Sequence, residues 1–305
     1  MLLRQLEYLV ALARERHFAR AAEACHVSQP SLSAAISKLE RELGVPVVSR
    51  GRRFEGLTPE GERVLLWAHR MLADRDALRQ DLSRMRESLS GTLRIGAIPT
   101  ALPAAPLLTT PFCERYPHVR ITLESLSSRE ITQGLDEFEL DLAMTYVDGS
   151  VPAVPLYEER YVLLTPADEE IAGRPVARWA DVAALPLCLL TSKMRNRRIL
   201  DDIFADAGVQ PVPMIEADTV ATLYAHVATH KWSSVVAHAW LQMFGAPDGM
   251  RVVRIENPRR VPRIGLVTGE QVSILARAML GLTRGLDVRG VLDRLLHEHL
   301  DRRDL

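Results

Sequence analysis

Cysteine is scarce in this 305-residue chain, which has only Cys25, Cys113 and Cys188, far apart in sequence. No two of them have the C-x-x-C spacing of a dithiol or zinc site, so we expect neither a disulfide framework nor a bound metal. The simplest interpretation is that they are small side chains in packed interiors. A redox switch formed by Cys113 and Cys188 is the alternative.

Long apolar runs and a strong net charge are also missing. No run of roughly 18 apolar residues occurs, and the N-terminus lacks the pattern of a signal peptide. We therefore expect a soluble cytoplasmic protein without a membrane partner. The formal net charge of −1 excludes a protein that coats nucleic acid through bulk charge. Residues 1–90 are mildly basic, with 15 Lys and Arg against 12 Asp and Glu.

Catalytic constellations are absent. His226 and His230 are four residues apart, but they lack the adjacent glutamate of a metalloprotease helix. We find no glycine-rich phosphate loop and no G-x-S-x-G nucleophile elbow. The sequence therefore predicts neither an enzyme nor a protein with a cofactor.

Residues 28–44 carry the most strongly marked helix of the chain. Ser28 can cap its first turn, Pro30 fits where amides lack partners, and Gly44 can end it in a left-handed conformation. An apolar stripe runs along one face, while the opposite face is short and rich in hydroxyls. The stripe consists of Leu32, Ile36, Leu39 and Leu43.

An alanine-rich segment, 18–25, precedes this helix and predicts a helix-turn-helix. Such a unit places the N-terminal part of its second helix in the major groove, where Gln29 can pair with adenine. Residues 45–57 then indicate a hairpin, or wing, with arginines near its tip, suited to phosphate or the minor groove. An ordinary core helix and a solvated loop are the alternatives. The residues expected to contact DNA are Ser28, Gln29, Pro30, Ser31, Ser33, Ser37, Lys38, Arg50, Arg52 and Arg53.

These motifs resemble, in order and spacing, those of the LysR-type transcriptional regulators. The resemblance covers about sixty residues, from Arg4-Gln5-Leu6-Glu7-Tyr8 through Val27-Ser28-Gln29-Pro30-Ser31 and Leu39-Glu40-x-Glu42-Leu43-Gly44 to Leu57-Thr58-x-x-Gly61. Ala34 and Ala35 depart from the family, where longer Arg or Gln side chains are common. The resemblance implies a sequence-specific regulator that binds promoter DNA, contacts RNA polymerase and responds to a small effector.

A long helix is expected after Thr58-Pro59, extending to about Leu89. Its apolar positions alternate steps of four and three, the pattern of a two-stranded coiled coil with one basic interruption. That seam comprises Val64, Ala68, Met71, Arg75, Leu78, Leu82, Met85 and Leu89. The pattern predicts a homodimer, and the resemblance implies that dimers assemble into a homotetramer.

Beyond Ser90-Gly91 the chain alternates short strands with helices, which predicts parallel sheets covered on both faces. The fold class we expect is therefore α/β with an all-α winged helix-turn-helix at the N-terminus. The resemblance implies two Rossmann-like subdomains, as in periplasmic binding proteins, joined by two crossing strands near 162–166 and 265–268. The expected divisions are a DNA-binding domain 1–58, a linker helix 59–90 and an effector-binding domain 91–305, with subdomain I at 91–163 and 267–305 and subdomain II at 164–266.

A ligand in such a domain would bind beyond the carboxyl ends of strands, where helix N-termini favour anions. Residues 191–198 concentrate four cations there, although Arg197 and Arg198 could instead pair with Asp201 and Asp202. The indole of Trp232 would leave room only for a small inducer. The expected effector contacts are Thr100, Ala101, Ser127, Ser128, Arg195, Asn196, Arg197, Trp232, Ser233 and Ser234.

The sequence thus predicts a regulator that responds to a small anionic inducer. Residues 194–198 and 232–234 look like those of regulators of formate dehydrogenase operons, which makes formate or another small carboxylate the expected inducer. The alternatives are a solute-binding protein, which the first ninety residues do not fit, and the redox-sensing regulator using Cys113 and Cys188.

Overall fold

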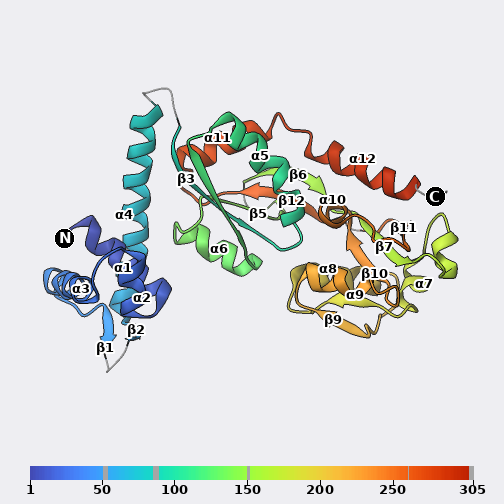
Figure 1. Cartoon of the computed structure of the whole chain (residues 1–305), viewed down its shortest axis with the longest axis horizontal. Helices are drawn as coiled ribbons and strands as arrows, with labels where there is room; N and C mark the ends of the chain where they lie inside the picture. Colours follow the sequence, from blue (N-terminus) through green and yellow to red (C-terminus); the bar gives the residue numbers. More distant parts are fainter. Residues whose placement is uncertain (51–53, 85–88, 150–151, 260, 302–305) are drawn as a thin grey trace. The chain divides into compact units, whose positions relative to one another are not determined.

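The computed structural model describes residues 1–50, 54–84, 89–149, 152–259 and 261–301 (Figure 1). The chain forms two compact units. One comprises Met1–Gly91 with Asp136–Glu139, and the other comprises Thr92–Leu135 with Leu140–Leu305. None of the helices in these described ranges is both long and apolar enough to cross a membrane.

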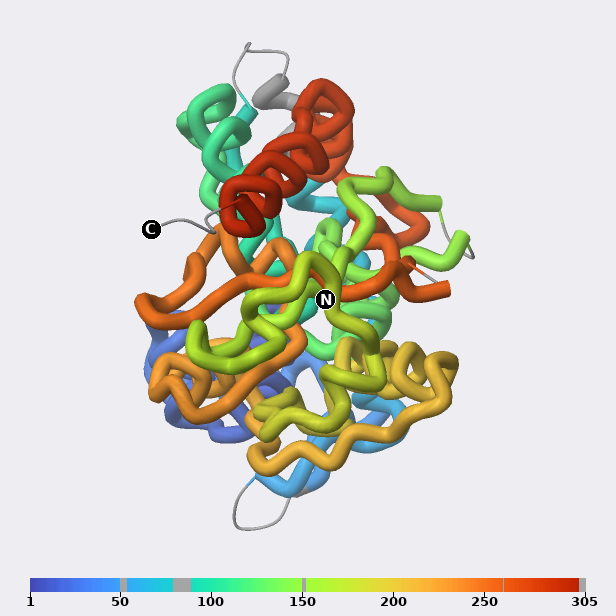
Figure 2. Tube along the Cα trace, turned by 90° about the vertical axis from the view of Figure 1, so that its right-hand side faces the viewer, coloured from blue at the N-terminus to red at the C-terminus, as the bar shows by residue number. Residues whose placement is uncertain are grey.

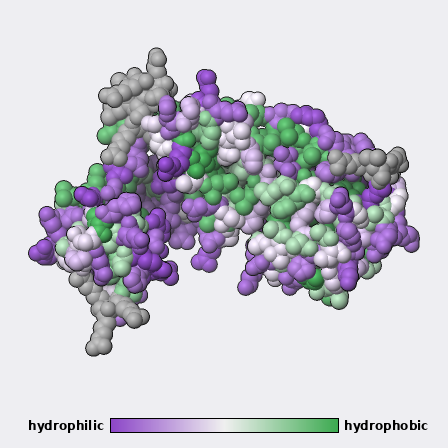
Figure 3. Space-filling model, in the orientation of Figure 1, coloured by the Kyte–Doolittle hydropathy of each residue, from purple (hydrophilic) through white to green (hydrophobic). Residues whose placement is uncertain are grey.

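The N-terminal unit is a helix-turn-helix followed by a hairpin and a long helix. Its elements are α1 (Leu3–Glu15), α2 (Phe18–Ala24), α3 (Gln29–Leu43), β1 (Val48–Arg50), β2 (Phe54–Leu57) and α4 (Pro59–Arg84). β1 and β2 pair antiparallel, which confirms the predicted hairpin. Leu32, Ile36 and Leu39 of α3 are fully buried against α1 and α2, as the stripe predicted, whereas Leu43, its fourth member, is 38% exposed in the last turn of the helix. The visible face of this unit is mostly hydrophilic (Figure 3).

The predicted apolar seam of α4 serves two purposes. Its first part lies in the core of its own unit, where Ala68 is fully buried and Val64 and Met71 pack against α1 and its neighbours. The basic interruption, Arg75, donates hydrogen bonds to Glu7 on α1 and to Asp76. Leu78, the next seam position, is 60% exposed, and the side chains of Leu82 and Met85 are outside the described part of the chain. The expectation that the whole stripe waits for a second chain was therefore wrong for the first turns, because α1 already covers them.

The second unit contains two groups of strands, and the first belongs to subdomain I. It is a five-stranded sheet in the order β4-β3-β5-β12-β6. β3 and β5 pair parallel, whereas β12 pairs antiparallel with both β5 and β6. Its strands are β3 (Gly91–Ala97), β4 (Val119–Ser125), β5 (Leu142–Tyr146), β6 (Ala153–Glu158) and β12 (Arg263–Val267).

Subdomain II holds an antiparallel sheet in the order β10-β7-β11 and a parallel pair, β8-β9. Within subdomain II, an isolated bridge between Leu187 and Ser233 joins the antiparallel sheet to the β8-β9 pair. The strands are β7 (Tyr161–Pro166), β8 (Cys188–Leu190), β9 (Ile215–Ala217), β10 (Ser234–Ala237) and β11 (Met250–Arg254). A core of buried side chains, including Trp240, Phe204 and Leu223, lies against these strands.

Two sequence-based expectations need correction. The sheets were expected to be parallel, but the five-stranded sheet is mixed and the β10-β7-β11 sheet is antiparallel. The reason is that the chain crosses between subdomains twice, and each crossing strand enters its new sheet against the direction of its neighbours. Strand β6 was not expected, since Pro152 and Pro155 disfavour a strand interior. Proline is tolerated on an edge strand, which β6 is. The predicted crossing strands are confirmed as β7 and β12.

Helices cover these sheets and connect the strands. They are α5 (Pro106–Arg115), α6 (Ser128–Asp136), α7 (Trp179–Ala183), α8 (Arg195–Asp206), α9 (Val220–Val227), α10 (Leu241–Phe244), α11 (Ile274–Thr283) and α12 (Val288–Asp301), with three 3-10 turns at η1 (Leu102–Ala104), η2 (Glu170–Gly173) and η3 (His238–Trp240). The C-terminal helix α12, red in Figure 2, contacts β6 of subdomain I and β11 of subdomain II. It therefore ties the two subdomains together.

Candidate DNA interface and effector site

The N-terminal end of α3 presents the side chains predicted to contact DNA. Ser28 caps the helix by accepting a hydrogen bond from the amide of Ser31 at 3.3 Å, and Gly44 ends it with φ 73°. Gln29, Pro30 and Ser31 are exposed on its first turn, while Ser33 and Ser37 are half-buried. A helix that contacts bases in the major groove needs an exposed first turn with an exposed polar side chain, and here that side chain is the carboxamide of Gln29.

Several hydroxyls of this face already have partners within the helix. The hydroxyls of Ser28 and Ser31 hydrogen-bond to each other at 2.8 Å, and Ser37 donates to the carbonyl of Ser33 at 3.0 Å. Lys38 lies 4.0 Å from the Glu42 carboxylate on the exposed face. Gln29 and Lys38 are therefore the long exposed polar side chains among the predicted contacts of α3, since Ala34 and Ala35 are short.

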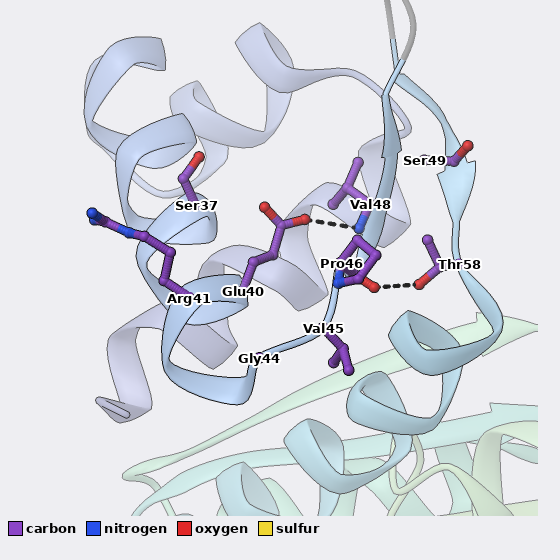
Figure 4. Close-up of a pocket in the computed structure, with 9 residues that line it drawn as sticks. All are labelled: Ser37, Glu40, Arg41, Gly44, Val45, Pro46, Val48, Ser49 and Thr58. Atoms are coloured by element: carbon purple, nitrogen blue, oxygen red, sulfur yellow. Dashed lines mark hydrogen bonds between the residues drawn. The ribbon is translucent and has the colours of Figure 1, made fainter.

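Glu40 fixes the hairpin against α3. Its Oε1 accepts hydrogen bonds from the amides of Val47 and Val48, at 3.1 and 3.2 Å, as Figure 4 shows for Val48. Thr58 donates to the carbonyl of Pro46 at 2.7 Å. A groove lies between α3 and the start of β1, with Ser37 on one side and Ser49 on the other (Figure 4). From the sequence, Glu40 was named only as part of the family motif, and this positioning role was not foreseen.

The predicted wing arginines are only partly described. Arg50 ends β1, and Arg52 and Arg53 lie outside the described residues.

The predicted effector residues fall into three groups. Thr100, Arg195 and Asn196 come together around Tyr146, the last residue of β5. Ser127 and Ser128 lie at the start of α6, where the Ser127 amide donates to the Glu130 carboxylate and the Glu130 amide donates to the Ser127 hydroxyl. The remaining members are buried or packed within their own subdomain: Ala101, Arg197, Trp232, Ser233 and Ser234.

In this third group, Arg197 and Ser233 already have structural partners, whereas the Ser234 hydroxyl is buried without a hydrogen-bond partner. Arg197 is only 7% exposed and donates to Asp201, Glu216 and the carbonyl of Leu190. The Ser233 hydroxyl bonds to Thr165 at 2.8 Å, both fully buried. Arg198, which we expected to pair with an aspartate, instead donates to the carbonyls of Ser192 and Lys193.

A buried carboxylate, Glu159, lies at the centre of the first group. It sits in the crossover between β6 and β7 and has no exposed surface. Its Oε2 accepts hydrogen bonds from the phenols of Tyr161 at 2.7 Å and Tyr146 at 2.8 Å, and from Asn196 Nδ2 at 3.2 Å. We call Thr100, Tyr146, Glu159, Tyr161 and Asn196 the Glu159 cluster. Its members come from both subdomains and from the segment that joins them.

The electrostatics of the cluster follow from its burial. Burial raises the pKa of Glu159 to about 7, because the charged form loses hydration, although the bonds from Tyr161, Tyr146 and Asn196 act in the opposite direction. Burial, and then the neighbouring Glu159 charge, raise the pKa of Tyr146 and of Tyr161 well above the usual value. The Arg195 guanidinium carbon lies 5.2 Å from the Tyr146 ring centre, a cation–π contact at the border of the cluster.

Sequence reasoning missed Tyr146, Glu159 and Tyr161. The available signal was a charged residue between two apolar strands with tyrosines close on either side, at 157 and 161. Only the approach of Asn196 from α8 shows that these residues form one site.

Comparisons with known proteins agree with this architecture. Residues 3–62 match the bacterial regulatory helix-turn-helix protein family of LysR, and residues 86–285 match the LysR substrate binding domain. A probable hydrogen peroxide-inducible genes activator of Streptomyces viridosporus is 32% identical over 303 residues, covering 95% of this chain and 97% of the relative. The transcriptional dual regulator OxyR of Escherichia coli K12 is 32% identical, covering 88% and 89%.

Solved structures show the same fold. A full-length OxyR from Pseudomonas aeruginosa with a cysteine-to-aspartate substitution has a TM-score of 0.74 at 27% identity, covering 95% of this chain and 97% of that one. CbnR in complex with its target DNA has a TM-score of 0.68 at 21% identity, covering 93% and 98%, a likeness of fold. The chain therefore belongs to the LysR family and is a DNA-binding transcriptional regulator, not an enzyme, with a helix-turn-helix and a two-subdomain effector-binding domain.

Proposed function

We propose that this regulator changes its DNA contacts when a small effector binds at the Glu159 cluster, where the two subdomains meet. The observation that carries the proposal is the hydrogen bond from Asn196 on α8 to Tyr146 on β5. A ligand that replaces this bond binds one arrangement of the subdomains better than the other. Such differential affinity is what allows a ligand to shift a conformational equilibrium.

The test is a footprint and bending assay of the full chain on DNA upstream of its own gene. Asn196→Leu and Glu159→Gln should alter the length of the footprint or the bend angle while half-site binding persists. The matched control is Arg198→Ala, an exposed change on the same helix. If both cluster variants give the wild-type footprint, bend and reporter output, the cluster has no part in the regulation.

A small anion such as formate, the inducer predicted from the sequence, is the second candidate. Arg195 at the start of α8 favours it, because its guanidinium lies over the Tyr146 ring at the border of the cluster. Arg197 does not add to this charge, since Asp201 and Glu216 neutralise it. The relatives named above are a probable hydrogen peroxide-inducible genes activator and a transcriptional dual regulator OxyR, so the comparisons give no support to a formate dehydrogenase branch.

The surroundings of Cys113 and Cys188 do not favour a response to peroxide through a disulfide between these two thiols. Cys188 is fully buried on β8, and burial raises its pKa to about 11, so the reactive thiolate is scarce. Cys113 is exposed on α5, in the other subdomain. The proposed effector therefore acts without a Cys113–Cys188 disulfide.

We also propose that the chain works as a homodimer or homotetramer on double-stranded promoter DNA in the cytoplasm, where it contacts RNA polymerase. The outward part of the α4 seam supports this, since Leu78 is 60% exposed on an amphipathic helix. Two copies would present two recognition helices to two half-sites.

A further inference from the structure

One oxygen of the Glu159 carboxylate carries all the hydrogen bonds of that group. Oε2 accepts three, whereas Oε1 is buried and has no hydrogen-bond partner. Buried carboxylate oxygens are normally paired, because an unpaired one loses its hydration without compensation. The side chain is also completely buried, so bulk water does not supply the missing donor. Glu159 Oε1 can therefore accept a hydrogen bond from a ligand, and an ammonium group is the strongest donor for a carboxylate oxygen.

The groups around this carboxylate also favour a cation. Tyr146 and Tyr161 both donate to Glu159 Oε2. Thus two of the six tyrosines of the chain bond to one carboxylate. Tyrosine rings attract cations through their negative faces, and Tyr146 already does so with Arg195.

An anion fits this position poorly. It would face the uncompensated Glu159 carboxylate, and like charges in a buried site repel strongly. The guanidinium of Arg197 is held by Asp201 and Glu216, so it does not offset that repulsion.

We propose that the effector carries a protonated amine, which pairs with Glu159 Oε1 beside Tyr146 and Tyr161. This inference rests on the proposed function and names its ligand class. The amine reaches Glu159 when the subdomains part at the bond between Asn196 and Tyr146, since the carboxylate is covered while that bond is closed. The groups that face the carboxylate are Tyr146, Tyr161 and Asn196, with Arg195 at the border.

Competition between the amine and a proton for Glu159 predicts a pH dependence of amine binding. Because the pKa of Glu159 is about 7, a cation must displace a proton from the carboxyl group below that pH. The affinity for an amine should therefore rise with pH, by up to about tenfold per unit, and level off above pH 7.

The experiment uses three probes of similar size and different charge: ethylammonium, ethanol and acetate, with formate as a fourth. Thermal shift and calorimetric titration on the full-length protein measure binding. Glu159→Gln removes the charge and keeps the shape. Glu158→Gln is the matched control, because Glu158 is the adjacent glutamate and forms surface ion pairs with Arg263 and Arg289.

Ethylammonium should raise the Tm of the wild-type protein and of Glu158→Gln, and not that of Glu159→Gln. Ethanol, acetate and formate should give no comparable shift. The proposal is overturned if acetate or formate binds more tightly than ethylammonium, if Glu159→Gln keeps the response, or if ethylammonium gives no shift.

DNA binding is recorded in the same samples. A chain that binds its upstream DNA and shows altered footprints in the cluster variants, yet ignores ethylammonium, keeps the proposed function and loses only the ligand class. If the cluster variants give the wild-type footprint, both the proposed function and the ligand class are contradicted.

Discussion

Asn196 Nδ2 donates to the Tyr146 hydroxyl at 3.1 Å, which connects the first turn of α8 in subdomain II to the end of β5 in subdomain I. The same amide also donates to Glu159 and to the Tyr161 hydroxyl, both at 3.2 Å. The Asn196 side chain thus contacts three of the four other members of the Glu159 cluster, all but Thr100. It is the group through which a ligand at this point would influence the position of the subdomains.

Replacing Asn196 by leucine should destabilise the effector-binding domain. The change removes a donor from a buried carboxylate, and hydrogen bonds to charged groups contribute about 1.5–3 kcal/mol. Urea denaturation followed by circular dichroism measures the effect. Arg198→Ala, an exposed change two positions away, should stay within about 0.5 kcal/mol of the wild type. Equal stability of the two variants would contradict the role given to Asn196.

The stability of the protein should depend on the charge of Glu159. Its pKa rises from 4.5 to about 7 on folding, so the folded state binds the proton more tightly than the unfolded state. Its contribution is fully present below pH 4.5 and is lost as the pH rises through about 7, by about 3 kcal/mol in total. Since other groups titrate as well, the measurement is the difference between wild type and Glu159→Gln in urea unfolding from pH 4.5 to 8.

His238 contributes to this pH profile with the opposite sign. Burial lowers its pKa from 6.5 to about 4, so its stabilising effect is present above pH 6.5 and is lost as the pH falls through about 4. A difference curve between wild type and Glu159→Gln cancels this contribution. A curve that is flat from pH 4.5 to 7 would refute the shift in Glu159.

Two α3 side chains should have separable effects on DNA binding. Gln29→Ala should relax the preference for one base pair, by about 1–3 kcal/mol of discrimination, because a bidentate amide contact reads adenine. Lys38→Ala, and likewise Arg52→Ala in the wing, should weaken binding to all sequences and reduce the salt slope by about 1. Competition binding on a library of operator variants at several salt concentrations separates the two. A uniform loss for Gln29→Ala would show that it does not read a base.

The outward part of the α4 seam should govern assembly. Leu78→Glu places a charge in the seam and should shift the protein to monomers, measured by light scattering after gel filtration. The control is Leu66→Glu, since Leu66 is also exposed on α4 but lies off the seam. Unchanged oligomeric state in Leu78→Glu with native circular dichroism would rule out this seam as a subunit contact.

Peroxide should leave the buried thiol untouched. Cys113 is expected to react with a thiol reagent in the native protein, and Cys188 only after unfolding, because a pKa of about 11 leaves about one thiolate in ten thousand at pH 7. Mass spectrometry after hydrogen peroxide treatment identifies the oxidised residue. Loss of DNA binding that requires oxidised Cys188 would support the thiol switch instead.

The local signals of the sequence determined the DNA-binding half. Ser28, Pro30 and Gly44 act within one helix, and the stripe of Leu32, Ile36 and Leu39 needs only the neighbouring helices to be buried. The crossing strands were placed by the resemblance to the LysR-type regulators and not by a local signal. Local order did not reveal that α1 covers part of the α4 seam, or that Pro155 lies on an edge strand.

Tertiary structure alone decided the effector site. Tyr146, Glu159 and Asn196 are distant in sequence, and their meeting depends on where two subdomains bring β5, the crossover and α8. The cations of residues 191–198 predicted an anion site because the sequence does not show their partners. Arg197 donates to Glu216, and these two residues come together only in the folded chain. Burial gives Glu159 its pKa of about 7, and burial is a property of the packed molecule, which a linear order of residues does not contain.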